Sequence, residues 1–553
     1  MKVSRAFDQL VGEYLTAWLR LHPVEALEGG QMGAAERLPP LGDDEIAVIR
    51  VLDDKLVAAL ETVDERALDP ERRLDLRLLE RAGRWECERL GTWDWRHREP
   101  AAFVPVGEIR QLFVRPVDDL ARGLVGRLEA LPARLRAARC LLSETPELVW
   151  RGAVESAIEE CRRGENLFRD LHEEPRIRQL RQVRGRLDSL LEQGVQALEE
   201  YARFLERELL PRSASSPDYG PACLGGELYH RAFIEAEPPC LEAMFDRAED
   251  LLHEELVGVA GELGENPAAL IRQLGSDRDA VCLLPDTLRA WLRETRRFLE
   301  TRLSLPEEWH SPRVEEGVGR SPDPVSPLHY VPPTPVAARC RATLYVALDE
   351  AHRFTQAEWL HALVSRGWPG AHLLALRGWS GSGEGGIVRR FFGSPVRSRS
   401  WGHAAERMMH EIGYFRGVGD QVVWLRNRLW VLERARADLA IHVTGEVFEG
   451  VAARLAGRFG WSEGQLLPAL WQVGRRPGEA VAEAVEMLLL EALSRCLGPV
   501  EWLRRLPDLL AGGNLPLPLL IPRLFGERTW RSVALEAGLE ESTSSVAGEG
   551  GRW

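Results

Sequence analysis

Apolar side chains recur at steps of three and four residues along most of the chain. The spacing is clearest in residues 117–142 (VDDLARGLVGRLEALPARLRAARCLL) and 187–210 (LDSLLEQGVQALEEYARFLERELL), where charged residues fill the intervening positions. Such spacing collects the apolar side chains on one face of an α-helix. Alternation of apolar and polar residues, which is typical of strands, is rare. The pattern therefore predicts a mainly α-helical protein.

One segment breaks this helical pattern. Residues 307–345 are too rich in proline and glycine for a helix, and they predict an extended connector with at most a few short strands near residues 307–350. The run RATLYVAL at 341–348 is the best candidate strand. We therefore expect a single domain over residues 1–538, with an amino-terminal helical half (1–306), the connector (307–345), a carboxy-terminal helical half (346–538) and a disordered tail (539–553).

Composition and charge exclude some classes of function. With 553 residues, of which 45% are hydrophobic, the chain can bury a large core. Its net charge of −14 argues against a surface that binds nucleic acid. No stretch approaches the length of uncharged apolar residues that a membrane span needs, and charged residues are spread through the amino end. The sequence thus predicts a cytoplasmic protein without membrane contact, and it leaves the oligomeric state open.

Five short motifs stand out in the second half of the chain. They are WPGAHLL (368–374), SWGHAAERMMHEIGYF (400–415), RARADLAIH (434–442), RPGEAV (476–481) and GGNLPLPLL (512–520). Their order and spacing resemble those of a bacterial family known as domain of unknown function 885 (DUF885). Residues 7–27 and 224–233 resemble the family's opening helix and its mid-chain signature, so the resemblance covers nearly the whole chain. It implies a large helical body of the zinc-peptidase type.

The resemblance implies a zinc site, but the first motif of that site is altered in this chain. Typical members carry a motif close to HEAVPGHH, in which a His would bind the metal and the adjacent Glu would activate a water molecule. Pro369 and Gly370 match the proline and glycine of that motif. The alignment then places Ser365 at the first His, Arg366 at the Glu and His372 at the last His.

The later motifs of the family are altered as well. The second motif is close to EGWALYAE, and its leading Glu would be a further metal ligand. Trp401 and Glu406 match this motif, but Arg399 stands at the leading Glu. In a late stretch close to PGQALSYK, Glu483 and Ala484 stand where a Tyr and a Lys are usual. The backbone features of the family are thus kept, while the side chains that would perform its chemistry are not.

Two arginines at the expected metal site oppose metal binding. A guanidinium is always charged and has no lone pair for a metal. A dication about 4 Å from one arginine is repelled by about 8 kcal/mol at the dielectric of a protein surface. The loss of the Glu at Arg366 also removes the base that would take a proton from water. We therefore predict a metallopeptidase-like protein that is not an active enzyme and holds no cofactor.

The alternative is an active metal-dependent hydrolase with a rearranged zinc site. His403, Glu406 and His410 are spaced to share one face of a helix, where they could approach one cation. His410 and Glu411 begin an HExxH-like motif, but Tyr414 stands at its second His. The candidate metal ligands for this alternative are His361, His372, His403, Glu406 and His410, with His442 as a further one.

The two arginines allow two roles in the former active-site cleft. In the first, Arg366 and Arg399 replace the metal as the positive centre and pair with Glu406 and Asp438. In the second, they form a guanidinium fork near His372 that binds a carboxylate or a phosphate, for example the C-terminus of a peptide. The predicted partner is accordingly a peptide or a small carboxylate, and the candidate cleft residues are Arg366, His372, Arg399, Glu406, Arg434, Asp438 and His442.

Overall fold

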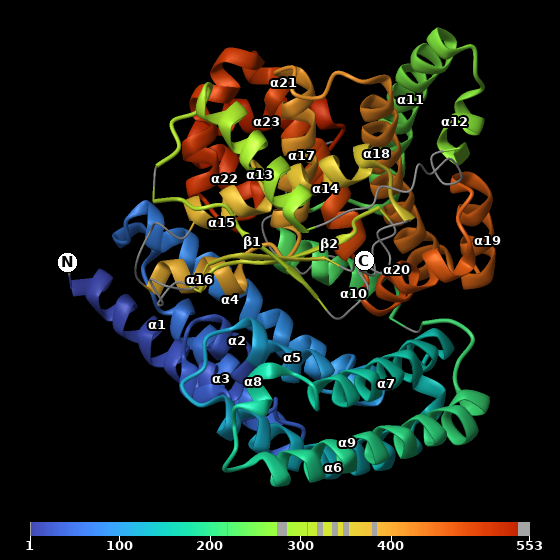
Figure 1. The fold of residues 1–553 in the computed structure, drawn as a ribbon. Helices are drawn as coiled ribbons and strands as arrows, with labels where there is room; N and C mark the ends of the chain where they lie inside the picture. Colours follow the sequence, from blue (N-terminus) through green and yellow to red (C-terminus); the bar gives the residue numbers. More distant parts are fainter. Residues whose placement is uncertain are drawn as a thin grey trace. The chain divides into compact units, whose positions relative to one another are not determined.

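The computed structural model is mainly α-helical and confirms the predicted fold class (Figure 1). It describes residues 2–217, 219–273, 285–306, 308–317, 325–334, 341–346, 353–378 and 384–539. Of the predicted disordered tail, Leu539 alone lies within the described residues. By the density of its contacts the chain divides into two compact units, Met1–Asp218 with Thr334–Cys340, and Tyr219–Pro333 with Arg341–Trp553. The expected single domain over residues 1–538 stays a prediction.

The first unit is built from amphipathic helices. The predicted helical segment 117–142 forms α6, which buries Leu124, Leu128, Leu131 and Leu135 on one face at steps of three and four residues. The helices of this unit are α1 (Lys2–Leu21), α2 (Pro23–Glu28), α3 (Asp43–Glu61), α4 (Pro70–Thr92), α5 (Val106–Val114), α6 (Leu120–Glu144), α7 (Arg151–Leu171), α8 (Pro175–Arg178) and α9 (Arg184–Phe204). α9 packs on α6 and α7, so that the three helices share one hydrophobic core.

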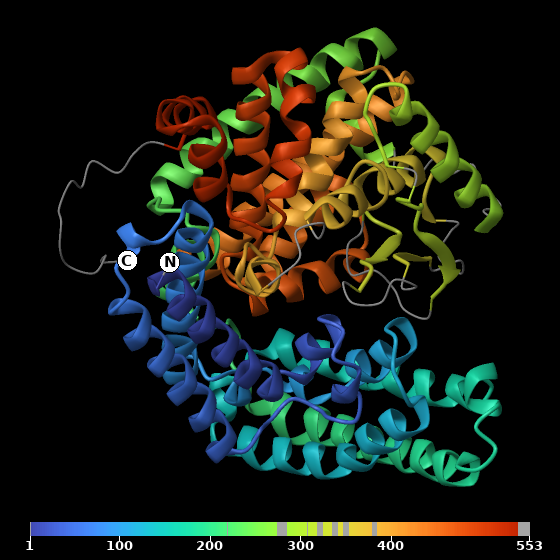
Figure 2. The same cartoon turned by 90° about the vertical axis from the view of Figure 1, so that its left-hand side faces the viewer.

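The second unit contains the five sequence motifs. Its helices are α10 (Gly220–Glu227), α11 (Pro238–Leu263), α12 (Pro267–Gln273), α13 (Pro285–Glu300), α14 (Gln356–Arg366), α15 (Ala371–Gly378), α16 (Glu384–Phe392), α17 (Arg397–Glu411), α18 (Val418–Leu439), α19 (Phe448–Phe459), α20 (Glu463–Arg475), α21 (Glu479–Ala511), α22 (Leu517–Phe525) and α23 (Glu527–Ala537). α21 packs along both α17 and α18. Figure 2 shows orange and red helices of this unit side by side. Residues 480–494 of α21 are all buried, which makes this helix the centre of the unit.

A small sheet lies in the connector, as the sequence predicts. Its strands are β1 (Arg313–Glu316), β2 (Leu328–Val331) and β3 (Thr343–Val346), and β3 falls within the candidate strand at 341–348. The strand order is β1-β3-β2, with β1 parallel and β2 antiparallel to β3. β2 is therefore an edge strand, and α14 packs against it.

Within the part of the chain that the structure describes, every helix is either too short or too polar to cross a lipid bilayer.

Candidate functional site

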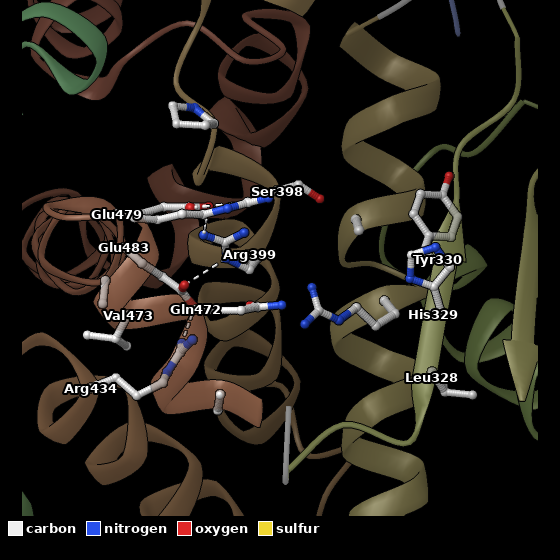
Figure 3. Close-up of a pocket in the computed structure, with 16 residues that line it drawn as sticks. Leu328, His329, Tyr330, Ser398, Arg399, Arg434, Gln472, Val473, Glu479 and Glu483 are labelled. Atoms are coloured by element: carbon white, nitrogen blue, oxygen red, sulfur yellow. Dashed lines mark hydrogen bonds and ion pairs between the residues drawn. The ribbon is translucent and has the colours of Figure 1, made fainter. Parts of the chain in front are cut away.

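The second unit contains a pocket of about 370 Å³ that opens to solvent. This volume lies in the range of small-molecule binding sites. Figure 3 shows residues of β2 on one side of the pocket and Arg399, Arg434, Glu479 and Glu483 on the other. The lining residues are Leu328, His329, Tyr330, Arg366, Ala371, Pro395, Ser398, Arg399, Arg434, Ala469, Gln472, Val473, Arg476, Glu479, Ala480 and Glu483.

The position of the pocket wall depends on how α21 begins. The buried carboxylate of Asp438 in α18 accepts hydrogen bonds from the backbone N–H groups of Gly478 (3.1 Å), Ala480 (3.1 Å) and Val481 (3.3 Å). It thus satisfies donors that a helix start leaves unpaired. Gly478 has a φ of 83°, and a Cβ there would lie 2.9 Å from the carbonyl oxygen of Leu224. The tight turn before α21 therefore favours glycine.

Three arginines and two glutamates form an ion-pair network in the pocket. Arg399 donates from Nε to Glu483 and from Nη2 to Glu479, both at 2.7 Å. Arg434 donates to Glu483 at 2.8 Å, and Arg476 donates to Glu479 at 3.3 Å. The two glutamates lie four residues apart on α21, so they share one face of that helix. Each glutamate is therefore held by two arginines from different elements.

The arginines keep both glutamates ionised. Burial by itself would raise the pKa of Glu483, but Arg434 and Arg399 outweigh it and hold the pKa well below its usual value. Burial also opposes ionisation of Glu479, yet Arg399 and Arg476 lower its pKa to about 2. The pKa of Arg399 is raised, because the attraction of Glu483 and Glu479 outweighs the effect of burial.

Arginine is the most frequent charged residue among the described residues that line the pocket. Arg366, the last residue of α14, lines it together with Arg399, Arg434 and Arg476. These four guanidinium groups share the described lining with two carboxylates, those of Glu479 and Glu483.

A chain of buried polar contacts leads inward from the pocket. His403 contacts Glu483 through Nε2 (3.2 Å), and its Nδ1 lies 4.0 Å from Glu406. Glu406 in turn contacts Nδ1 of His361 (2.9 Å) and accepts a hydrogen bond from Asn427 (3.3 Å). Burial would raise the pKa of Glu406, but His361 and His403 lower it. Glu406 therefore lies beneath the pocket wall, paired with histidines rather than with Arg366 or Arg399.

His372 lies behind the β2 side of the pocket. Its Nε2 contacts the carbonyl oxygen of His310 at 2.9 Å, and its Nδ1 contacts the hydroxyl of Tyr330 at 2.9 Å. Burial lowers the pKa of His372 to about 4, so the imidazole is neutral at pH 7. A carbonyl oxygen can only accept, so Nε2 carries the proton and Nδ1 accepts the proton of Tyr330. His372 thus holds a pocket residue in place without lining the pocket itself.

Comparison with known proteins identifies the family. Residues 23–489 match the family described as "Bacterial protein of unknown function (DUF885)". The chain belongs to this family. No curated protein matches the sequence.

Two solved structures share the fold of this DUF885 protein. One is a "putative lipoprotein" of unknown function from Shewanella oneidensis, with 15% identity, a TM-score of 0.71, and coverage of 93% of this chain and 98% of that one. Another, also described as a "putative lipoprotein", comes from Colwellia psychrerythraea. It has 13% identity and a TM-score of 0.74, and the match covers 97% of this chain and 100% of that one. At this identity the likeness shows the fold alone.

Arginines and hydrogen-bonded histidines stand where the resemblance implies the zinc-binding residues of this DUF885 protein. Arg366 and Arg399 bring positive charge to the place where the resemblance puts a base and a ligand. Both ring nitrogens of His372 have partners, and His403 and His361 each use one nitrogen on a glutamate. Among the described residues, no three His, Cys, Asp or Glu side chains gather as a metal site would need.

The remaining candidates lie in the protein core. Ser365 is buried against Gly402, where a Cβ would lie 2.4 Å from the serine Oγ, so these two small residues let α14 and α17 approach closely. His442 contacts the carbonyl oxygen of Val473 at 3.1 Å and lies 3.8 Å from Asp438, too far for a hydrogen bond. The ring of His410 lies tilted against the rings of Phe415 and Trp424, near His361.

The structure thus brings three of the candidate cleft residues to one pocket and places the others around it. Arg366, Arg399 and Arg434 line the pocket, whereas His372, Glu406, Asp438 and His442 support it from behind. The sequence analysis missed other lining residues, above all Arg476, Glu479 and the β2 residues. A signal for one of them existed, because RPGEAV places Glu479 four residues before Glu483 at the start of a helix.

Proposed function

We propose that this DUF885 protein binds a small anion, such as a carboxylate or the C-terminus of a peptide, in the arginine-lined pocket. The observation that carries the proposal is the gathering of four arginines from separate parts of the second unit among the described residues that line the pocket. Arginine presents paired N–H donors that match a carboxylate or phosphate, and the low dielectric of a partly buried site strengthens such contacts.

We propose further that the ligand is bound without metal-dependent hydrolysis. Arg366 stands where the resemblance implies the general base, and Arg399 stands where it implies a metal ligand. The two carboxylates among the described lining residues, Glu479 and Glu483, are bonded to arginines and ionised. A carboxylate held in this way is a weak base, since its pKa lies far below neutral pH. These features support a binding protein rather than a hydrolase.

Calorimetric titration tests the binding. We expect N-acetylglycine, a small carboxylate that resembles a peptide C-terminus, to bind at low ionic strength, and its uncharged amide not to bind. Arg366→Gln and Arg434→Gln should each weaken binding, because each removes a charge from the pocket wall. Arg504→Gln, at an exposed position of α21 outside the pocket, removes the same charge and serves as the control. Equal binding by all three variants would contradict the proposal.

Metal analysis tests the absence of hydrolysis. Purified protein with stoichiometric zinc, together with peptidase activity that a chelator abolishes, would overturn this part of the proposal and favour the rearranged zinc site. Anion binding with no such activity would support it.

The cytoplasmic location stays a prediction. Both solved structures named above carry the description "putative lipoprotein", which makes the cell envelope the alternative location for this chain. Cell fractionation distinguishes the two, and recovery of the protein with the membrane fraction would contradict the prediction.

A further inference from the structure

We infer that the pocket takes a free α-amino acid, whose carboxylate binds to the arginines and whose ammonium group binds to Glu479. The class of ligand is thus a small zwitterion rather than a simple anion. This inference rests on the proposed function, because it adds a second charged group to the carboxylate that the same pocket would bind.

Opposite charges alternate along the wall of the pocket that faces β2 (Figure 3). The groups follow one another, each bonded to the next, in the order Arg476, Glu479, Arg399, Glu483 and Arg434. Both carboxylates are ionised, because the arginines hold their pKa below its usual value. A ligand with a single charge meets a like charge beside every opposite one on this wall. A ligand with two opposite charges can place each of them against its counterpart.

Two of these arginines keep N–H donors for a carboxylate. A guanidinium group has five such donors. Arg399 uses Nε and Nη2 for the glutamates and Arg434 uses Nη2, so in both side chains Nη1 bonds to none of the residues that the structure describes. The side chains are 29% and 14% exposed where they line the pocket. A carboxylate in the pocket can therefore bond to one or both of these Nη1 groups.

Glu479 keeps acceptor capacity for an ammonium group. An ionised carboxylate offers about four lone-pair sites. Glu479 accepts from Arg399 at one oxygen and from Arg476 at the other, and its side chain is 16% exposed. The side chain of Glu483 is 1% exposed and contacts two arginines and a histidine. Of these two carboxylates, Glu479 is the one that a ligand can reach.

The sites for the two charges of the ligand are adjacent. Nη1 and Nη2 belong to the same guanidinium group of Arg399, and Nη2 lies 2.7 Å from the carboxylate of Glu479. A carboxylate bound at Nη1 is therefore close to Glu479, which repels it unless a positive group lies between them. In an α-amino acid one carbon separates the ammonium group from the carboxylate, and both are ionised at neutral pH. The ammonium group is thus in place to bond to Glu479.

L-alanine and propionate form a matched pair of probes, because they differ by the ammonium group alone. By calorimetric titration at about pH 7 and low salt, we expect L-alanine to bind about ten-fold more tightly or better, since one hydrogen bond between charged groups supplies that factor. N-acetylglycine has an N–H donor without the charge, so it should bind less tightly than L-alanine. Equal affinity of L-alanine and either of the other two probes would overturn the inference.

Two variants separate the two ends of the ligand. Glu479→Gln should weaken the binding of L-alanine and strengthen that of propionate, because it removes the partner of the ammonium group and a charge that repels the carboxylate. General damage to the pocket would weaken both. Arg434→Gln should weaken both probes by a similar factor, and Arg504→Gln, outside the pocket, should change neither. If Glu479→Gln leaves the ratio of the two affinities unchanged, the ammonium group does not bind to Glu479 and the inference is wrong.

The outcomes also separate this inference from the proposed function. The comparison of the probes in the unchanged protein does not depend on the folding of any variant. If propionate or N-acetylglycine binds and L-alanine binds no more tightly, the inference fails and the proposed function stands. If none of the three probes binds, the proposed function fails as well.

Discussion

Arg399→Gln removes the guanidinium group that joins two carboxylates of α21. In the structure this side chain donates one hydrogen bond to Glu483 and one to Glu479, both at 2.7 Å. Glu483 is almost fully buried, so water cannot replace the lost donor there. The variant leaves two neighbouring carboxylates with one arginine each, Arg434 for Glu483 and Arg476 for Glu479.

The expected loss of stability follows from these contacts. A hydrogen bond to a charged group contributes about 1.5–3 kcal/mol, so two of them set an upper bound of about 6 kcal/mol. The side chain of Arg399 is 29% exposed, and the remaining arginines still attract the glutamates, which lowers this figure. We expect the free energy of unfolding of the second unit to fall by about 2–4 kcal/mol.

Arg476→Gln is the matched control, because it also removes an arginine bound to Glu479. Its side chain is 66% exposed and its contact is 3.3 Å long. Exposed ion pairs of this kind contribute less than about 1 kcal/mol. The comparison separates the effect of burial from the effect of losing one positive charge.

Urea denaturation measures the difference, with hydrogen exchange to locate it. The chain contains two compact units, so a single transition is not assumed, and exchange of the amides in α17 and α21 reports the second unit alone. If Arg399→Gln and Arg476→Gln lower the stability of these helices equally, within about 0.5 kcal/mol, the buried network does not stabilise the unit as we describe.

Three further predictions concern pH and backbone geometry. The fold lowers the pKa of Glu479 from an ordinary value of 4.5 to about 2. The stability that ionised Glu479 contributes is therefore present above pH 4.5 and is lost as the pH falls towards 2. Acid unfolding measured on the second unit should show this loss. Asp53 in the first unit behaves in the opposite way, because burial raises its pKa from 3.8 to about 7 although its bond to the hydroxyl of Tyr14 opposes this. The stability that protonated Asp53 contributes is present below pH 3.8 and is lost as the pH rises through 7. At pH 8, Asp53→Asn should therefore be more stable than the unchanged protein, by about 4 kcal/mol at most. Equal stability of the two proteins in urea at pH 8 would contradict this. Gly478→Ala should lower the melting temperature, since a positive φ and the nearby carbonyl oxygen of Leu224 both oppose a Cβ; an unchanged melting temperature would show that the turn tolerates a side chain.

Much of the fold could be predicted from local sequence. The spacing of leucines in α6 is visible in residues 117–142, and the strand candidate at 341–348 contains β3. Local pattern is sufficient here, because one helix face or one strand depends on neighbours in sequence. Alignment of the motifs also placed Arg366 and Arg399 near one cleft, and both line the same pocket.

The partners of the arginines could not be predicted in the same way. The sequence suggested Glu406 and Asp438 for Arg366 and Arg399, but Arg399 pairs with Glu479 and Glu483. Which carboxylate an arginine meets depends on how α17, α18 and α21 pack, and that packing is set by contacts across long sequence separations. Asp438 was a reasonable candidate by charge, yet it is used to hold the first turn of α21.

The departures from the family pattern make physical sense as one compensated change. Arg399 stands where the resemblance implies a glutamate, and Glu483 stands where it implies a tyrosine, and these two residues bond to each other at 2.7 Å. A glutamate at both positions would bring like charges together on buried, facing helices, and an arginine without Glu483 would keep Glu479 but lose its more deeply buried partner. Each residue therefore removes the electrostatic cost of the other. Because the two charges of this pair offset each other, a search for the ligand is best directed at other arginines that line the pocket, Arg366 and Arg434.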